Sequence, residues 1–462
     1  MERLGSSFRD PAGFLFRDGE VLLRQVNPEY ADDYDLLMGS GLYDALTEGG
    51  MLVRHREVAP PFSGPGAGAA YRVLRPELVP FVSYPCEWCF AQLRDAALLT
   101  LRIQDAALDH GMTLKDASAF NVQFAGGAPV LIDTLSFERY RPGEPWIAYR
   151  QFCQHFLAPL LLMSTVDARL AGLARAHLDG IPLDLASRLL PRGSWLRPGV
   201  MLHVHLHARS LARHGDTALD ASSRTLTVSL TALRGLVDSL RSTIQGLRWT
   251  PSRSEWSDYV GTRRYSAQAV DAKAALVRAY LASIDPAPRM VWDLGANTGE
   301  FSRVAAETGA RVVAFDVDPA AVERNYLAAR EETGTAILPL VLDLANPTPG
   351  LGWAGEERSS WMARGPADVV MALALLHHLA IGNNVPLDSV ARLLAAAGRM
   401  LIIEWVPKED EQVQRLLRSR RDVFPGYTRE GFEAAFATRF RTLRADPIQG
   451  SGRWMYLMER AG

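Results

Sequence analysis

The chain has 462 residues, 48% of them hydrophobic, and a formal net charge of −2 at neutral pH. This length exceeds the roughly 250–300 residues at which a single hydrophobic core stops growing, so it predicts two or three domains. The near-zero charge argues against a nucleic-acid-binding protein that relies on bulk electrostatic attraction. No stretch reaches the roughly 18 apolar residues of a membrane span, and the N-terminus lacks the basic-then-apolar pattern of an export signal. We therefore expect a cytoplasmic protein whose partners are neither nucleic acids nor membranes.

The first half of the chain alternates short strand-like runs with helices. The sequence GFLFRDGEVLLRQV, residues 13–26, predicts a hairpin that turns at Asp18–Gly19. Residues Asp33–Glu48 have helical spacing followed by two glycines, and Ala59–Tyr71 has the composition of a loop. We assign residues 1–213 to an α+β domain.

Two groups of residues in this half have the composition of metal sites. Cys86 and Cys89 form a single CxxC pair, but no second pair of cysteines or histidines stands at a suitable spacing for zinc. The three histidines of HVHLH, residues 203–207, lie in a helix-like stretch, where a spacing of two residues scatters the rings around the helix. We expect these two cysteines and Cys153 to be buried free thiols, and we expect no metal centre.

A predicted linker joins the first domain to a second one. Residues 222–247 predict an amphipathic connecting helix, and the polar, aromatic residues 248–266 precede the first helix of the second domain. We assign 214–266 to this connection and 267–462 to the second domain. From Ala267 on, helical stretches alternate with the apolar runs MVWDLG, RVVAFD, AILPLVLD, ADVVMALAL and RMLIIEW, a pattern that predicts an α/β fold with a doubly wound parallel sheet.

The stretch MVWDLGANTGEFSRVAAETGARVVAFDVDP, residues 290–319, predicts a ligand site in that sheet. Ligands bind where the carboxyl end of the first strand passes into its helix, and glycines there let the backbone approach. The dinucleotide pattern G-x-G-x-x-G fails, because its second and third glycines are replaced by Asn297 and Glu300. A glutamate at that position favours a ligand with a neutral or positive centre. Asp316, at the end of the second strand, suits a ribose diol, and Asp343, at the end of the third, suits an adenine amino group.

With Asp293, Gly295 and Gly299 in the first turn, this set of strand ends resembles the class I S-adenosylmethionine-dependent methyltransferases over about residues 256–460. The resemblance implies a Rossmann-like fold and S-adenosylmethionine as cofactor. It places Asp293, Gly295 and Asn297 at the methionine portion, Asp316 at the ribose, and Asp343 and the Leu344 amide at adenine. Asn297 departs from the glycine that the family often has there. The remaining residues that we expect to contact the cofactor are Ala296, Gly299, Val317 and Ala372, with Trp256, Tyr259 and Tyr265 either folding over it as a lid or only packing.

The residues that would act on the acceptor follow the fourth and fifth strands. His377 and His378 stand where many small-molecule members of the family have a histidine pair, and His377 is our first candidate for a base or substrate-orienting group. The alternative is that both histidines only pack the pocket wall. Glu404, ending the fifth strand, either orients the substrate, binds an amine or pairs with a surface arginine. Residues 419–436 would form part of the substrate wall, and we expect O-methylation ahead of N-methylation, on a small-molecule or carrier-bound acceptor.

A second resemblance lies in the first half. In LKDASAFNVQFAGGAPVLIDTLSF, residues 114–137, Asp116, Asn121 and Asp133 have the order and spacing of the catalytic and metal-binding residues of protein-kinase-like and aminoglycoside-phosphotransferase-like folds. The departures are the missing glycine-rich loop and the absence of lysine in the first hundred residues, where Arg24 is the nearest substitute. We therefore favour a degenerate kinase-like domain that recognises or presents the acceptor. The alternative is an unrelated α+β domain in which the spacing of these residues is accidental.

Three functional hypotheses follow. The first is a two-domain S-adenosylmethionine-dependent methyltransferase. The second is a Mg-ATP-dependent phosphotransferase, or a bifunctional enzyme, in which Asp116 positions the hydroxyl while Asn121 and Asp133 hold magnesium. The third is a non-catalytic protein that binds S-adenosylmethionine as a structural or sensory ligand. The sequence leaves the acceptor and the oligomeric state open.

Overall fold

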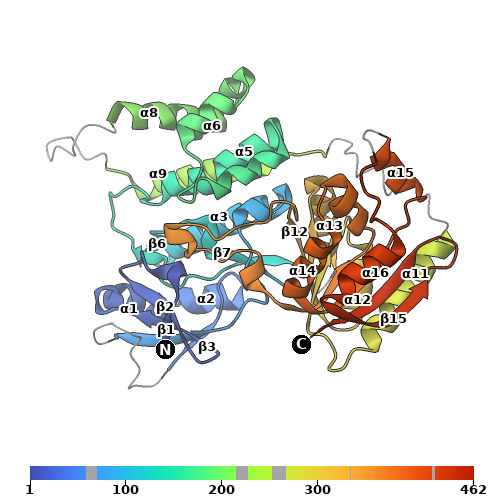
Figure 1. Ribbon diagram of the computed structural model, residues 1–462. Helices are drawn as coiled ribbons and strands as arrows, with labels where there is room; N and C mark the ends of the chain where they lie inside the picture. The colour runs from blue at the N-terminus through green and yellow to red at the C-terminus, as the bar shows by residue number, and fades with distance from the viewer. Residues whose placement is uncertain (59–69, 215–226, 252–266, 333, 419–421, 462) are drawn as a thin grey trace. The chain divides into compact units, whose positions relative to one another are not determined.

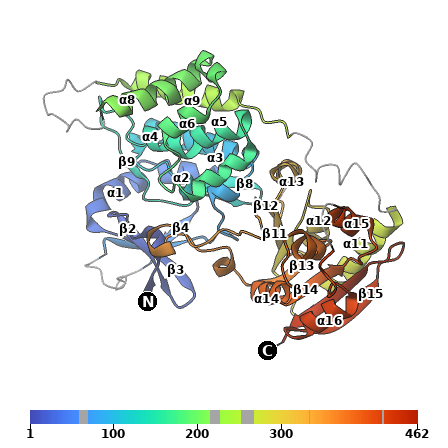
Figure 2. The ribbon, with the colours of Figure 1, turned by 45° about the horizontal axis from the view of Figure 1, so that its top comes forward.

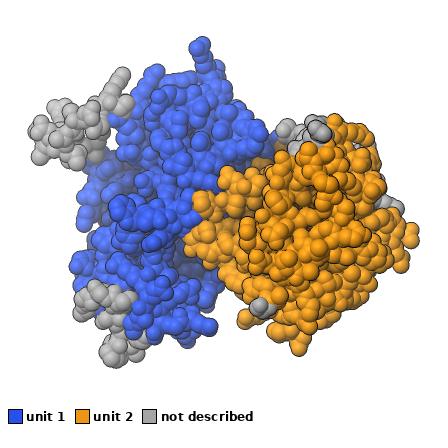
Figure 3. Space-filling model, in the orientation of Figure 1, with its two compact units in different colours: residues 1–250, 350–358 blue, residues 251–349, 359–462 orange. Residues whose placement is uncertain are grey.

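The computed structural model describes residues 1–462 except 59–69, 215–226, 252–266, 333, 419–421 and 462 (Figure 1, and turned in Figure 2). The chain divides into two compact units (Figure 3). The first unit comprises Met1–Thr250 together with Gly350–Arg358, and the second comprises Pro251–Pro349 together with Ser359–Gly462. The segment Gly350–Arg358, which we name the excursion segment, therefore interrupts the second unit in sequence and packs within the first.

The first unit begins with an antiparallel five-stranded sheet in the order β1-β2-β3-β5-β4. The predicted hairpin is present, but the two residues that connect its strands are Gly19 and Glu20, one position later than predicted. Gly19 has a φ of +59°, a conformation that glycine adopts without steric cost. The strands are β1 (Glu2–Arg3), β2 (Gly13–Asp18), β3 (Val21–Val26), β4 (His55–Glu57) and β5 (Arg72–Pro76).

The helix predicted over Asp33–Glu48 is wrong as a single element. The structure has two helices here, α1 (Ala31–Gly39) and α2 (Leu42–Glu48). They are separated at Gly41, whose φ of +83° is incompatible with a continuous right-handed helix. The periodicity of the apolar residues continues across this break, so the sequence pattern concealed it. Most of the predicted loop Ala59–Tyr71 lies outside the described residues.

The rest of the first unit is mainly helical and is organised around one long, largely buried helix, α3 (Phe90–Asp109). Two small antiparallel ribbons follow it, β6 (Met112–Leu114) with β9 (Phe137–Arg139) and β7 (Val122–Ala125) with β8 (Ala128–Leu131). The antiparallel sheet and the later helices together give the α+β character that the sequence predicts. The remaining α-helices that the structure describes here are α4 (Tyr149–Phe152), α5 (Ala158–Thr165), α6 (Leu183–Leu189), α7 (Pro198–Val200), α8 (His207–His214) and α9 (Leu230–Gly246).

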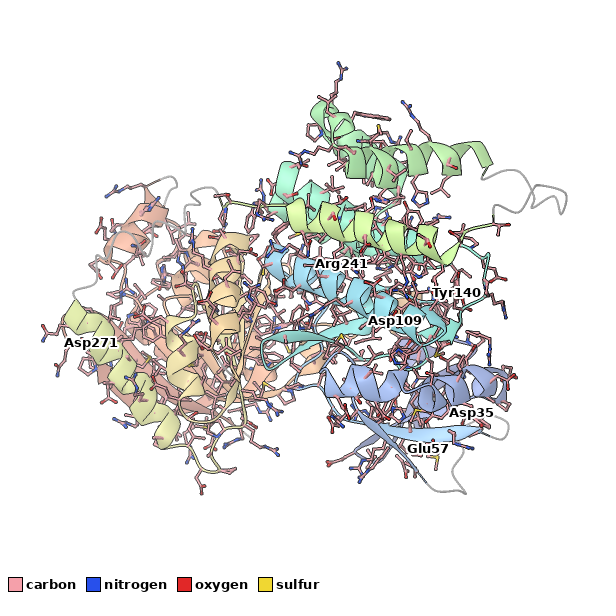
Figure 4. All side chains as sticks on the ribbon, turned by 180° about the vertical axis from the view of Figure 1, so that it is seen from behind. Asp35, Glu57, Asp109, Tyr140, Arg241 and Asp271 are labelled. Carbon is pink, nitrogen blue, oxygen red and sulfur yellow. The ribbon has the colours of Figure 1, made fainter. Side chains whose placement is uncertain are left out.

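Helix α9 falls within the stretch predicted to be a connecting helix, and in the structure it packs along α3. Its apolar stripe, Leu233, Val237, Leu240 and Ile244, is buried on one face. At the polar edge Arg234 pairs with Asp109 at 2.6 Å, and Arg241 pairs with Asp105 (Figure 4 labels Asp109 and Arg241). The helix is therefore part of the first unit.

The second unit contains a seven-stranded sheet in the order β12-β11-β10-β13-β14-β16-β15. The five apolar runs predicted as strands form its parallel part, which confirms the Rossmann-like fold. The C-terminal strands β15 and β16, which the sequence analysis did not anticipate, extend it in antiparallel fashion. The strands are β10 (Met290–Leu294), β11 (Arg311–Asp316), β12 (Ile337–Val341), β13 (Ala367–Ala372), β14 (Gly398–Trp405), β15 (Phe440–Pro447) and β16 (Trp454–Arg460).

Helices connect the parallel strands. The chain moves from β10 outward to β12, then returns to β13 on the other side of β10 and moves outward to β14. Because βαβ crossovers are right-handed, the helices of these two halves cover opposite faces of the sheet. The order reverses between β10 and β13, which is where open α/β sheets bind ligands. The α-helices among the described residues of this unit are α11 (Ala267–Ala282), α12 (Glu300–Ala306), α13 (Pro319–Glu331), α14 (Leu387–Ala397), α15 (Glu411–Leu417) and α16 (Arg429–Ala437).

Aromatic side chains form part of the core of the second unit. Trp292, Phe315 and Trp361 are buried against one another, with the two indole centroids 5.2 Å apart. Trp292 and Phe315 immediately precede the acidic residues Asp293 and Asp316, so this packing fixes the strand ends that bear them. Within the described part of the chain, no helix combines the length and apolarity needed to traverse a lipid bilayer.

Candidate functional site

The carboxyl ends of β10 and β11 bring two predicted acids to the same edge of the sheet. Asp293 lies in β10 and is only 2% exposed, and its Oδ2 accepts a hydrogen bond from Ser302 Oγ at 2.6 Å. Asp316 is the last residue of β11, the neighbouring parallel strand. Its two carboxylate oxygens accept hydrogen bonds from the backbone N–H groups of Asn297 at 2.8 Å and Asp318 at 2.9 Å. Both side chains are thus held in fixed orientations.

The turn between β10 and α12 joins these acids through its backbone. Gly295 and Gly299 have φ of +77° and +82°, and Asn297 has a φ of +50°, which asparagine tolerates better than most residues. A Cβ at Gly299 would lie 2.3 Å from Asn325 Oδ1, so only glycine fits there. Asn297 therefore keeps the left-handed conformation that a glycine would provide, and its N–H orients Asp316.

Burial opposes the ionisation of both acids. Desolvation raises the pKa of Asp293 to about 6, although the Ser302 hydrogen bond and the charge of Lys273 act in the opposite direction. Desolvation likewise raises the pKa of Asp316 to about 6 against the effect of its backbone hydrogen bonds. At neutral pH both are mostly ionised yet poorly solvated, which favours a ligand that offers positive charge or hydroxyl donors.

The other residues expected to contact the cofactor lie at or near the same edge. Ala372 is the last residue of β13 and pairs with Leu294. Val317 is 50% exposed just beyond β11. Asp343 is exposed two residues beyond the end of β12, and its Oδ1 accepts a hydrogen bond from Ala345 N at 2.8 Å. These positions fit a ligand laid along the strand ends, with Ala296 following Gly295 in the turn and Leu344 following Asp343.

His377 follows β13 and is completely buried. Neither ring nitrogen has a hydrogen-bond partner among the residues that the structure describes, and the ring centroid lies 4.1 Å from that of His378. Burial, with the charges of His378 and Arg453, lowers the pKa of His377 well below its usual value. Burial also lowers the pKa of His378 to about 4. Both rings are therefore neutral at physiological pH, and His377 has unused hydrogen-bonding capacity.

Glu404 belongs to a buried ion-pair network rather than to a pair with a surface arginine. Its Oε2 lies 2.6 Å from Lys273 Nζ on α11, and its Oε1 accepts a hydrogen bond from Arg453 at 3.0 Å. Arg453 also pairs with Asp410 at 2.7 Å. Although burial alone would raise the pKa of Glu404, the charges of Lys273 and Arg453 hold it at about 2. The carboxylate is thus permanently ionised and engaged by two cations of the protein.

Lys273 and Arg453 are the site residues that sequence reasoning missed. Lys273 also lies over the Phe301 ring at 4.3 Å and acts electrostatically on both Asp293 and His377. The chain has three lysines, and this one lies within an otherwise ordinary helix, which is a weak signal. Arg453 lies between β15 and β16, which were not predicted, so nothing in its sequence context indicated this contact.

The aromatic residues proposed as a lid, Trp256, Tyr259 and Tyr265, lie outside the described residues. The predicted substrate wall, residues 419–436, is described from Asp422 onward. In it Tyr427 is buried, its ring 4.5 Å from that of Trp405, and its hydroxyl donates to Val406 O at 2.9 Å.

The kinase-like residues of the first unit lie together around Ser136. Asn121 Nδ2 donates to Ser136 Oγ at 3.3 Å, and Ser136 Oγ donates to Asp133 Oδ2 at 2.7 Å. The backbone N–H of Asp116 donates to Ser136 O at 3.4 Å. Arg24, from β3, pairs with Asp133 at 2.8 Å and with Asp10 at 2.9 Å. The three residues thus meet in the structure, with the arginine that the sequence analysis named beside them.

The excursion segment supplies a second guanidinium to this region. Arg358 stacks over the Phe120 ring at 4.6 Å, and the carboxylate of Asp116 is among the groups that stabilise its charge. The preceding residue, Glu357, is buried and pairs with Arg9 at 2.6 Å. Two ion-paired or stacked side chains therefore fix the excursion segment within the first unit.

The HVHLH histidines form no metal-like cluster. His203 and His205 are buried, and both ring nitrogens of each are hydrogen-bonded to hydroxyl groups, those of Tyr149, Ser239, Ser187 and Ser194. Across the residues that the structure describes, no three side chains of the metal-binding types are grouped to hold an ion. Cys86, Cys89 and Cys153 are buried free thiols, as predicted.

The parallel sheet with its switch point, the glycine turn and the paired acids define a class I S-adenosylmethionine-dependent methyltransferase, with S-adenosylmethionine as its cofactor. A family model described as "Methyltransferase domain" matches residues 265–439. Over 463 aligned residues the chain is 37% identical to the nodulation protein NoeA of Rhizobium meliloti (strain 1021), covering 99% of this chain and 96% of that protein. The chain belongs to the NoeA family.

Two solved structures are more distantly similar to this chain. The magnesium protoporphyrin IX methyltransferase ChlM of Synechocystis PCC 6803, with bound SAH, is 19% identical with a TM-score of 0.31, covering 46% of this chain and 90% of that chain. The bifunctional kinase-methyltransferase WbdD is 20% identical with a TM-score of 0.28, covering 41% of this chain and 39% of that chain. At these scores neither likeness bears on the acceptor or on the first unit.

Proposed function

We propose that this methyltransferase acts on a hydroxyl oxygen of a small or medium-sized acceptor, either free or carried on a larger molecule. N-methylation is the less favoured possibility. The observation that carries this proposal is the completely buried, neutral His377, which follows the strand that pairs with β10 and whose ring nitrogens form no hydrogen bond within the described residues. A neutral imidazole nitrogen is an acceptor suited to a hydroxyl group.

The cofactor contacts follow from the strand ends. S-adenosylmethionine supplies a methyl group activated on a sulfonium centre. We propose that Asp293 and the turn Gly295–Gly299 hold its methionine portion and that Asp316 accepts hydrogen bonds from the ribose hydroxyls. The proposal is supported by the free lone pairs that remain on Asp316 after its two backbone hydrogen bonds. Asp343 and the Leu344 amide would then meet the adenine, because they follow the next strand along the sheet.

His377 would orient the acceptor more than deprotonate it. A histidine whose pKa lies well below its usual value is a weak base at neutral pH. It can still accept a hydrogen bond from the acceptor hydroxyl and so align the oxygen with the methyl carbon, and such positioning contributes much of the acceleration of a displacement reaction. His378, whose ring lies 4.1 Å from that of His377 at an interplanar angle of 40°, would limit the orientations of the imidazole.

The test can be made while the acceptor is still unidentified. S-adenosylmethionine with a labelled methyl group is incubated with the protein and the small-molecule fraction of the source cells, and labelled products are identified by mass spectrometry. His377→Asn should lower labelling by about 10²-fold, the size of effect expected when a reacting group loses its positioning, while the affinity for S-adenosylhomocysteine, measured by calorimetry, stays within about threefold. Undiminished labelling would remove His377 from the mechanism, and a labelled N-methyl product would replace O-methylation.

We further propose that the methylated acceptor is a molecule used in nodulation, because a relative aligned over nearly the whole chain is a nodulation protein. The prediction is that deletion of the coding sequence changes a methylated product needed for nodulation. A deletion strain that makes an unchanged set of methylated metabolites would contradict it.

For the first unit, we infer a role in binding the acceptor rather than in phosphoryl transfer. The inference is supported by the engagement of Asp133 with Arg24 and by the charge of Arg358 beside Asp116. An acid already paired with a fixed guanidinium gains less from a magnesium ion. A thermal shift with Mg-ATP that is abolished by Asp133→Ala would overturn this inference in favour of the phosphotransferase.

A further inference from the structure

A cavity of about 730 Å³ opens at one end of the five-stranded sheet of the first unit. None of the methyltransferase or kinase-like candidate residues lines it. Its walls come from the β2–β3 turn, the start of β3, helix α2, strand β4 with the residue before it, and the end of β5 with the two residues after it. The cavity is therefore a feature of the first unit alone.

Two arginines lie side by side on adjacent strands in the wall of this cavity. Arg56 in β4 and Arg75 in β5 are direct partners in the antiparallel register, and both line the cavity. Residues opposite each other in such a pair project from the same face of the sheet, roughly 4.5–5.5 Å apart at Cβ, where like charges are destabilising. Within the described part of the chain, neither guanidinium has an ion-pair partner. A third exposed arginine, Arg54, lines the same cavity, and among the described residues its guanidinium donates only to the backbone carbonyl of Thr47.

The register shows why these charges are unusual. Val73, two residues before Arg75, projects from the same face of the sheet and belongs to a buried cluster with Phe14, Phe16 and Leu23. The face thus changes abruptly from a packed apolar surface to two opposed guanidinium groups. If this end of the sheet were only exposed to solvent, an arginine near a carboxylate would be more stable than two opposed arginines. Arg72 and Glu57, on the same two strands, form such an ion pair at 3.2 Å.

Two acids complete the polar lining. Glu20 and Glu77 also line the cavity, and no ion pair joins either of them to an arginine among the described residues. Three arginines and two glutamates leave a formal charge of +1 at the cavity. Guanidinium groups bind the oxygens of an anion, whereas free carboxylates accept hydrogen bonds from hydroxyl groups. A cavity that has arginines and glutamates without ion-pair partners therefore matches a ligand that carries an anionic group and hydroxyl groups.

We propose that this cavity binds a small hydroxylated anion, of the kind represented by a sugar that carries a phosphate or sulfate ester. The anionic group lies between Arg56 and Arg75 and relieves their repulsion, and Glu20 and Glu77 receive hydroxyl groups of the sugar. The cavity volume is sufficient for a ligand of one or two sugar rings. This binding site does not depend on the proposed methyl transfer, because every residue that lines it belongs to the first unit.

The test uses the full-length protein and three probes, namely glucose 6-phosphate, inorganic phosphate and glucose, titrated by calorimetry. The expected result is saturable binding of glucose 6-phosphate, weaker binding of phosphate and none of glucose. Replacing both arginines, in Arg56→Ala/Arg75→Ala, should lower the affinity for glucose 6-phosphate at least tenfold. Arg102→Ala is the matched control, because Arg102 is an exposed arginine of α3 in the same unit that does not line the cavity.

A second measurement, the change in thermal midpoint caused by Arg75→Gln, distinguishes a binding site from a purely structural pair of arginines. In buffer without multivalent anions, Arg75→Gln should raise the thermal midpoint of the first unit, because it removes a repulsion. In the presence of glucose 6-phosphate the order should reverse, with the wild-type protein the more stable. The proposal is overturned if the wild-type protein shows no saturable binding, or if the double variant binds as tightly as the control. Equal affinities for phosphate and glucose 6-phosphate would overturn the proposed hydrogen bonds from the sugar hydroxyl groups to Glu20 and Glu77.

Discussion

Replacing Asp293 by asparagine is expected to stabilise the cofactor-free protein at neutral pH and to weaken its affinity for the cofactor. The reason is that burial opposes ionisation of this carboxyl, raising its pKa from 3.8 to about 6, whereas a cationic ligand requires the ionised form. Asparagine has a similar shape and keeps an oxygen that can accept the hydrogen bond from Ser302. Lys273 retains its ion pair with Glu404 at 2.6 Å, so the substitution does not leave its buried charge without a partner.

The size of the effect follows from the shift of about two pKa units, at 1.36 kcal/mol per unit. Below pH 3.8 the carboxyl is protonated in both the folded and the unfolded chain, so its ionisation costs nothing. Between pH 3.8 and 6 the folded state binds more protons than the unfolded state, so stability falls as the pH rises. Above pH 6 the cost is constant at about 3 kcal/mol, and Asp293→Asn removes it. At pH 4.5 the same linkage leaves a gain of only about 1 kcal/mol.

Urea unfolding at pH 8 and pH 4.5, followed by the fluorescence of the neighbouring Trp292 and the other tryptophans, measures both values. Calorimetry with S-adenosylmethionine at pH 8 measures the loss of affinity. Asp271→Asn is the control, because Asp271 is an exposed acid on α11 of the same unit (Figure 4). A variant less stable than the wild type at pH 8, or a gain that is the same at both pH values, would refute the reasoning.

Three further results are expected. Because the pKa of Asp316 is also about 6, cofactor affinity should fall about tenfold between pH 7 and pH 5 for this group alone, and calorimetry on Asp316→Asn should show a correspondingly flatter profile. Lys273→Met leaves the buried Glu404 with Arg453 as its remaining cation and should cost roughly 3–5 kcal/mol in urea unfolding, a loss that Lys273→Met/Glu404→Gln should largely restore. Arg24→Leu should destabilise the first unit, near the lower end of the same range of roughly 3–5 kcal/mol, since the two acids it pairs with are only partly buried; a thermal midpoint unchanged from wild type would contradict this.

The parts of the structure that local sequence patterns specify could be predicted. Each parallel strand is a continuous apolar run bounded by polar residues, because both faces of such a strand are covered by helices. The acids Asp293 and Asp316 end two such runs, and parallel strands place their carboxyl ends at one edge. The closeness of these residues therefore followed from their order along the chain. The three kinase-like residues also met for a local reason, since all fall within residues 114–137, which contribute to two small ribbons.

The parts that depend on distant contacts could not be predicted. Glu404 ends a strand in the same way as Asp316, yet its environment is determined by Lys273, which precedes the sheet, and by Arg453, which lies between its last two strands. No local pattern distinguishes an acid open to a ligand from one neutralised by the protein. The break at Gly41 was missed because the apolar period continues through it, and the excursion segment was missed because its sequence gives no sign that it packs within the first unit.

The two units differ in how the charge of their carboxylates is neutralised. In the second unit Asp293 is buried and Asp316 is partly buried, and neither has a guanidinium partner among the described residues. Their raised pKa values indicate carboxylates that a positively charged sulfonium ligand would stabilise. In the first unit Asp133 has an arginine at 2.8 Å, so the protein itself supplies that positive charge. Adding a metal ion there would require displacing the arginine or placing two cations beside one carboxylate, and both are costly in a partly buried site. If Arg24→Ala permitted Mg-ATP binding that the wild-type protein lacks, the arginine would be identified as the substitution that ended an earlier nucleotide site; if it did not, the acids serve the fold of the first unit alone.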